Sequence, residues 1–196
     1  MRNQQLLSRY EVSPRGEILI DVSVRTVEDL FNYFDRAAAF RKKDLDQDFV
    51  DYLIDCVREI KGEPFVLRII LQTVEEMERL DHTRRSIRNY FKYLKDVAYA
   101  DCRHLLRRSL LYLLLGVALL SLSLALPGEA FAAPRVFHNL LSEGLTIAAW
   151  VSMWQAFAQL IFDLPPRLHI IRIYRRILRA PLLFVSAGKP VSEPAR

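Results

Sequence analysis

An apolar stretch in the last third of the chain contains three polar residues at helical spacing. Ser152, Gln155 and Gln159 are spaced so that they share one side of an α-helix, and no charged residue occurs from 144 to 162. Polar groups in lipid require hydrogen-bonding partners. We therefore interpret these side chains, with Gly116 and Ser121 of an earlier apolar stretch, as an assembly face in a membrane. The same face would line the pore of a small oligomeric channel or pore-forming effector, and this alternative stays open.

Acidic residues form a second regular pattern. They recur along one face of a helix predicted from 44 to 61, and they are Asp44, Asp48, Asp51 and Asp55. Calcium loops need a tight glycine turn, which a regular helix lacks. We therefore favour a solvated face. An acidic docking face, paired with a basic helical row from Arg84 to Lys95, is the remaining interpretation.

The residues of catalysis and metal binding show no such pattern. The four histidines (His82, His104, His138, His169) are far apart and have no partner at metal-ligand spacing. The chain contains six glycines and no phosphate-binding or nucleophile-elbow motif. We predict no catalytic residue, no metal and no cofactor. An enzyme is the least favoured class, because its site would have to be shared with another chain.

Two apolar stretches must position the polar face. Residues 109–126 and 144–162 carry no charge, and each is close to the roughly 20 residues that cross a ~30 Å hydrocarbon core. We predict a two-helix transmembrane hairpin with a periplasmic loop over 127–143.

Basic residues set the predicted orientation. Arg135 is the only cation of the loop, whereas arginines flank the outer ends of both spans: Arg103, Arg107, Arg108, Arg167, Arg172, Arg175, Arg176 and Arg179. The positive-inside rule then places both termini in the cytoplasm of a bacterial-type inner membrane. Cys56 and Cys102 both fall on that reducing side, so no disulfide is expected.

The segment 166–180 has arginines on one side and apolar residues on the other. After a helix break at Asp163–Pro166, this pattern predicts a basic amphipathic helix lying on the membrane surface. We expect anionic lipid headgroups to bind six arginines: Arg107, Arg108, Arg172, Arg175, Arg176 and Arg179. Lipid explains the net charge of +5 without a nucleic-acid partner.

Residues 16–72 predict a small cytoplasmic α/β module. Alternating patterns indicate strands over 17–24 and 64–72, separated by a helix over 27–40, capped by Thr26, and the helix over 44–61. Thr73 and Glu76 predict a capping box that starts a juxtamembrane amphipathic helix over 73–108. The order β-α-α-β-α favours a parallel crossover. Two strands make a marginal sheet. A strand from the N-terminal arm, a second copy or another protein would complete it.

The remaining segments are a flexible N-terminal arm (1–15) and a disordered tail (187–196). The fold class is thus an α-rich membrane protein, with a two-helix transmembrane hairpin and a small α/β module. We expect an assembly, scaffold or regulatory subunit that contacts anionic lipids. Its protein partner would be a second copy or a larger membrane complex.

Overall fold

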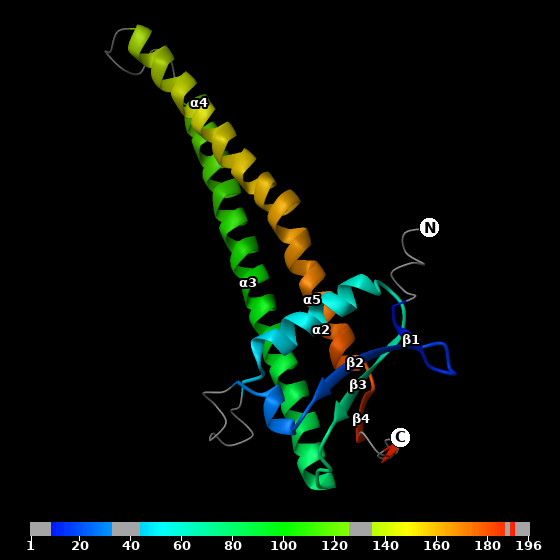
Figure 1. The fold of residues 1–196 in the computed structure, drawn as a ribbon. Coiled ribbons are helices and arrows are strands. Elements are labelled where there is room, and N and C mark those ends of the chain that lie inside the picture. The colour runs from blue at the N-terminus through cyan, green and yellow to red at the C-terminus, as the bar shows by residue number, and fades with distance from the viewer. Residues whose placement is uncertain (1–8, 33–43, 126–134, 187–188, 191–196) are drawn as a thin grey trace. The chain divides into compact units, whose positions relative to one another are not determined.

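The structure of the protein is a computed structural model, and it describes residues 9–32, 44–125, 135–186 and 189–190 (Figure 1). The chain forms two compact units. The first unit comprises Met1–Asp96 together with Arg172–Arg196, and the second comprises Val97–Ile171.

The first unit is built on a five-stranded sheet in the order β1-β2-β3-β4-β5. The strands are β1 (Glu11–Val12), β2 (Ile18–Val24), β3 (Phe65–Leu71), β4 (Leu182–Ser186) and β5 (Lys189–Pro190). The three central strands are parallel and the two short outer strands pair antiparallel. The predicted parallel pairing of the first two long strands is confirmed. The N-terminal arm supplies β1, whereas β4 comes from a segment to which the sequence pattern assigned no element.

Helix α2 (Gln47–Glu59) connects β2 to β3. Asp46 caps it, because its Oδ1 accepts from the backbone N–H groups of Asp48 and Phe49 at 3.0 and 3.2 Å. The apolar residues that recur at helical spacing over 45–60 are buried except for Tyr52: they are Leu45, Phe49, Leu53, Cys56, Val57 and Ile60. Tyr52 is 47% exposed and its hydroxyl donates to the backbone oxygen of Asp21.

The prediction of an α-helix over 27–40 is wrong for its first turn. Val27–Leu30 form a short 3-10 helix, η1, which ends before Phe31. Thr26 does cap this turn, and its N–H donates to Asp29 at 3.1 Å. Phe31 then forms a bridge with Leu45, so the chain is extended there. Residues 33–43 lie outside the described part of the chain.

Helix α3 runs without a break from Met77 to Ala125. The expected capping box at Thr73 is wrong, because α3 begins at Met77 and the Thr73 hydroxyl donates to the backbone carbonyl of Arg25 at 3.0 Å. Thr83 is buried inside the helix, where its hydroxyl donates to the Arg79 carbonyl at 2.9 Å.

The helix that follows α3 in the chain is also continuous, so the expected break at Asp163–Pro166 is wrong. α4 (Arg135–Ala158) passes through a π-helical turn, η3 (Gln159–Asp163), into α5 (Leu164–Arg179). Proline has no N–H and its ring clashes with the carbonyl four residues earlier. The wide π-helical turn directly before Pro165 and Pro166 relieves that clash, and the chain stays helical.

The end of α5 packs in the first unit. Ile173 and Ile177 are buried, and the Tyr174 ring lies 6.2 Å from the ring of Phe91 on α3. This corrects the expectation that the apolar face of 166–180 lies on lipid, because here that face packs against protein.

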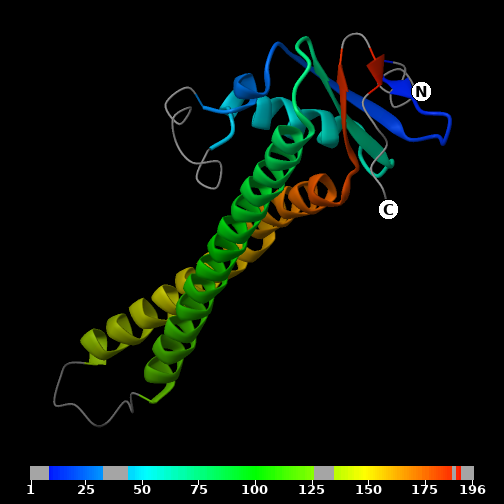
Figure 2. The same ribbon diagram turned by 90° about the horizontal axis from the view of Figure 1, so that it is seen from below.

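In the described part of the chain, helices cover one side of the sheet and not the other (Figure 2). The side chains of Ile20, Leu67, Ile69 and Phe184 point to this side and are buried. Residues of alternate register point to the opposite side, which we call the open face. It consists of Leu19, Asp21, Ser23, Val66, Arg68, Ile70, Leu183 and Val185.

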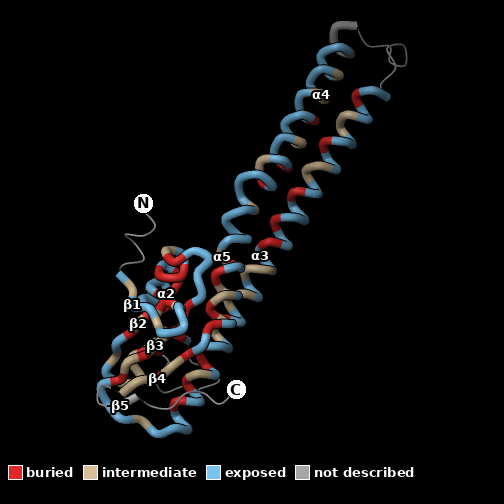
Figure 3. Tube along the Cα trace, turned by 90° about the vertical axis from the view of Figure 1, so that its right-hand side faces the viewer, coloured by how far each residue is buried: buried red, intermediate tan, exposed pale blue. Residues whose placement is uncertain are grey.

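The two long helices could span a membrane by length and composition. They are Met77–Ala125 and Asn139–Arg179, and only 17% of the most apolar 18-residue window in each is buried. Figure 3 shows the buried positions of α3 and α4 recurring along one side while most of the surface is exposed. A core helix of a soluble protein would be mostly buried instead.

Candidate assembly surfaces

Hydroxyl groups join α3 and α4 at two levels of the second unit. Ser109 Oγ donates to the carbonyl of Ala156 at 2.9 Å. Ser123 Oγ donates to the carbonyl of Ser142 at 3.0 Å and lies 2.9 Å from Thr146 Oγ1. Such interhelical bonds in a membrane contribute roughly 0.6–2 kcal/mol each. They specify how the two helices align.

Between these levels the helices approach closely at Gly116. A Cβ atom on this residue would lie 2.5 Å from Met153 Cγ and 3.0 Å from the Ala149 carbonyl oxygen. Ala149 itself has no exposed surface. Only glycine fits at this point of the interface.

The contact residues of each helix are small and seven residues apart. We call them the hairpin seam, and they are Ser109, Gly116 and Ser123 on α3 and Ser142, Ala149 and Ala156 on α4. A seven-residue repeat is typical of two helices that wrap around each other in a left-handed sense. The small residues at this repeat are the signal in the sequence that predicts the pairing, whereas the positions of the polar residues alone do not.

The residues of the predicted assembly face lie in different environments. Gln159 is 4% exposed, and its Oε1 has no hydrogen-bond partner among the described residues. Gln155 is exposed. Gly116 lies in the hairpin seam, whereas Ser121 is exposed. The structure therefore does not bring these residues together on one surface.

A second line of small residues follows another side of α4. Gly144 and Ala148 are exposed, Ser152 is half-buried, and Gln155 is one turn further along. A Cβ atom on Gly144 would meet nothing within 4 Å. The Ser152 hydroxyl donates to the Ala148 carbonyl at 2.8 Å, so its donor is used within the helix. We call Gly144, Ala148, Ser152 and Gln155 the outer face of α4.

An ion-pair cluster occupies the open face of the sheet in the first unit. Arg68 donates through Nε and Nη2 to the two carboxylate oxygens of Asp21, at 2.6 and 2.5 Å. Its Nη2 also donates to Glu11 at 2.6 Å. Asp21 and Arg68 are cross-strand neighbours, and the strand register thereby positions the pair. These bonds favour the charged guanidinium and raise the pKa of Arg68.

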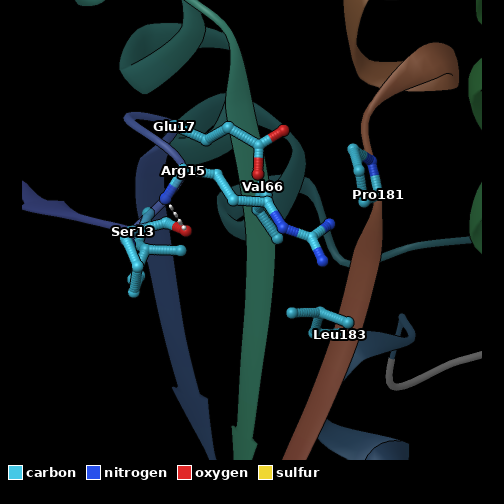
Figure 4. Close-up of a pocket in the computed structure, with 8 residues that line it drawn as sticks. Ser13, Arg15, Glu17, Val66, Pro181 and Leu183 are labelled. Atoms are coloured by element: carbon cyan, nitrogen blue, oxygen red, sulfur yellow. Dashed lines mark hydrogen bonds between the residues drawn. The ribbon is translucent and has the colours of Figure 1, made fainter. Parts of the chain in front are cut away.

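A cavity of about 410 Å³ lies beside this cluster (Figure 4). Leu19, Val66 and Leu183 of three adjacent strands form its apolar floor. Arg15 and Glu17 lie at its rim with Ser13. The floor is apolar and the rim is charged, and such a surface can accept an apolar side chain of a partner.

A second cavity, of about 400 Å³, lies between β1, β2 and α2. The Tyr10 hydroxyl donates to Glu59 at 2.8 Å there, and burial is the main cause that raises the pKa of Tyr10. Burial, followed by a hydrogen bond to Cys56, raises the pKa of Tyr52 to about 12. Both phenols therefore stay protonated at neutral pH and act as hydrogen-bond donors.

The acidic residues on α2 and directly before it are at the surface. Asp44, Asp48, Asp51 and Asp55 are all exposed. Asp51 accepts from the Gln47 side chain at 3.0 Å, and Asp55 pairs with Arg58 at 2.6 Å. The described residues contain no group of three or more His, Cys, Asp or Glu that could hold a metal ion. Of the basic row proposed to pair with this face, Arg84 instead pairs with Asp81 of its own helix.

Of the six arginines expected at lipid headgroups, five are exposed and one is part of the first unit's packing. Arg107, Arg108, Arg172, Arg175 and Arg179 are exposed. Arg176 donates to the carbonyls of Val57 and Glu63 at 3.2 and 2.5 Å, and it lies 5.3 Å from the centre of the Phe65 ring. Burial lowers the pKa of Arg176. Arg176 therefore joins α5 to the α2–β3 connection, a role that the charge pattern did not reveal.

Comparison with protein-family models, with curated proteins and with solved structures finds no match for this chain.

Proposed function

We propose that the protein is a membrane-anchored assembly or scaffold subunit whose first unit binds a partner protein through the open face of its sheet. One observation carries this proposal: helices cover one side of the sheet, while the other presents half-buried aliphatic residues around the Arg68 cluster. The three central strands are parallel, and parallel strands usually lie in sheets whose two faces are both covered. A partner would complete the layer.

The topology of the chain supports the membrane anchor. β3 and β4 are adjacent parallel strands, and the segment that connects them contains both long apolar helices. Both ends of this connection return to one sheet, so the two helices must cross a membrane an even number of times. The arginines outside the apolar stretches favour the cytoplasmic side of a bacterial-type inner membrane for that sheet.

The open face can be tested by placing a charge on it. Ile70→Glu and Val185→Glu introduce carboxylates among the aliphatic residues, and Asp48→Lys changes an exposed position on α2 as a matched control. We expect a partner that copurifies with the full chain in mild detergent to be lost with the first two variants and retained with the control. Circular dichroism and membrane retention verify that each variant folds and inserts.

Retention of the same partner by all three variants would contradict a binding role of the open face. Loss with Asp48→Lys alone would assign the partner to the acidic residues of α2 instead.

A second candidate is a small oligomeric channel. One observation favours it: the Gln155 amide lies on the outer face of α4, where several copies could enclose it. The hairpin seam itself is filled by Met153 and Ala149 against Gly116, so a pore would have to form between copies. Solute flux through liposomes that contain the purified protein, abolished by Gln155→Leu, is the result that this alternative requires.

A further inference from the structure

We propose that two copies of this chain pair in the membrane through the outer face of α4, with Gln155 bonded to Gln155 of the second copy. This inference rests on the membrane anchoring proposed above and names the partner of the second unit. The observation behind it is a polar side chain, Gln155, that is exposed on an apolar helix. Gln155 is exposed within a charge-free stretch, and no described residue bonds its amide.

The chemistry of the amide selects the partner. A primary amide carries two N–H donors and one carbonyl acceptor, so it is complementary to a second copy of itself. Lipid chains offer the amide no hydrogen-bonding partner. Two chains inserted with the same topology place Gln155 at the same depth, and a two-fold axis along the membrane normal brings the two residues together. A different protein would have to carry a matching polar group at that depth.

The surroundings of Gln155 permit close approach. Gly144, Ala148 and Ser152 are spaced by four residues and Gln155 follows three residues later, so all four lie on one side of α4. The three smaller residues leave room for a second helix backbone, and nothing lies within 4 Å of a Cβ on Gly144. Because the Ser152 hydroxyl is already bonded to Ala148, the serine acts as a small residue.

The outer face is also free of the hairpin. Ala149 and Ala156 face α3 and are buried, and at 3.6 residues per turn the outer face lies roughly a quarter turn around α4 from them. Pairing of two copies therefore leaves the α3–α4 contact intact. By contrast, Gln159 is buried and is not available to a second copy.

The experiment measures energy transfer between donor- and acceptor-labelled full chains in phosphatidylcholine vesicles over a range of protein-to-lipid ratios. We expect the wild type to dimerise. Gln155→Leu should weaken dimerisation by roughly 3- to 30-fold, the effect of one or two interhelical hydrogen bonds in a bilayer. Gln159→Leu, the matched control, should leave dimerisation unchanged.

Disulfide trapping locates the contact independently. In a background with Cys56 and Cys102 replaced by serine, Ser152→Cys should form a cross-linked dimer and Phe157→Cys should not. Phe157 is exposed at a similar depth on a different side of α4.

Equal dimerisation of wild type and Gln155→Leu would overturn the proposal, and so would preferential cross-linking at position 157. A chain that is monomeric at every ratio but resists alkaline extraction from membranes would overturn the pairing and leave the membrane anchor standing. Extraction at alkaline pH would instead refute the anchor itself.

Discussion

Arg68 holds two carboxylates from two neighbouring strands, and this arrangement makes it sensitive to substitution. The side chains of Arg68 and Asp21 are 24% and 37% exposed. Arg58 and Asp55 on α2 form a pair of similar length at 54% and 66% exposure. Water screens the second pair far more than the first, because exposed ion pairs gain little in a high dielectric.

We expect Arg68→Gln to lower the free energy of unfolding by about 1–3 kcal/mol, because Asp21 and Glu11 then face each other without a cation. Arg58→Gln should change it by less than about 1 kcal/mol. Thermal unfolding of the detergent-solubilised chain measures both. Equal effects would mean that the Arg68 cluster is no stronger than a surface pair.

The tyrosines beside α2 predict a response to alkaline pH. The pKa of Tyr52 is raised to about 12, so folding favours the protonated phenol. Its contribution to stability is complete below the ordinary pKa of about 10 and is lost as pH rises towards 12. We expect the unfolding midpoint of the wild type to fall more between pH 8 and 11.5 than that of Tyr52→Phe. Tyr93→Phe, at a 61% exposed position, should behave like the wild type.

At the scale of elements, the sequence predicts the helix α2, whose apolar residues other than Tyr52 face the core. It does not predict the strand β4, which is apolar on both of its sides. The stripe of α2 meets only the core, so its 3.6-residue period is clear and the helix was found. β4 packs on the helices through Leu182 and Phe184 and presents Leu183 and Val185 to the open face. A run that is apolar on both sides shows no alternation, and this strand was therefore missed.

Sequence patterns predict the ends and breaks of helices less well than the helices themselves, because these features depend on tertiary contacts. Pro165 and Pro166 predict a break, yet the π-helical turn before them keeps the helix continuous. Thr73 fits the pattern of a capping box, yet its hydroxyl donates to the backbone carbonyl of Arg25. The helical period groups Gln155 with Gln159, but the structure leaves Gln155 exposed and buries Gln159.

The hairpin seam and the outer face of α4 give a matched pair of glycines. Gly116→Ala places a methyl group against the Ala149 carbonyl and Met153, and we expect it to destabilise the helix pair by about 1–3 kcal/mol. Within a single copy Gly144→Ala meets open space, and the better helix former should stabilise the monomeric helix pair by up to about 1 kcal/mol. Reversible unfolding in mixed micelles measures both. A Gly116→Ala variant as stable as the wild type would mean that α3 and α4 do not approach closely there.

At the scale of the whole molecule, the chain interrupts a small α/β module with a long helical hairpin. The module has its own core, formed by residues from both sides of the interruption, such as Phe65, Phe91 and Ile177. Predicting this required knowing that residues beyond the second apolar helix return to the sheet. Local patterns carry no information about a strand pairing between segments more than a hundred residues apart.

The proposed topology predicts which side of a membrane each segment faces. In a chain with Cys56 and Cys102 replaced by serine, Ala130→Cys should react with an impermeant thiol reagent added outside intact cells. Ser13→Cys should react only after the cells are opened. Position 130 lies outside the described residues and position 13 lies beside β1. The reverse labelling pattern would invert the topology, and labelling of both would exclude the hairpin.

The parallel pairing of β3 with β4 also imposes an order of events during synthesis. β2, α2 and β3 leave the ribosome first, but the strand that pairs with the far edge of β3 follows both apolar helices. Until both helices and β4 have been synthesised, the Leu67–Leu71 edge of the sheet lacks its β4 neighbour and its backbone groups are available to other chains. A chain that ends before β4 would thus expose an incomplete sheet, the kind of surface that chaperones and proteases act on. Completion of the sheet would thus come after the proposed membrane anchor has been made.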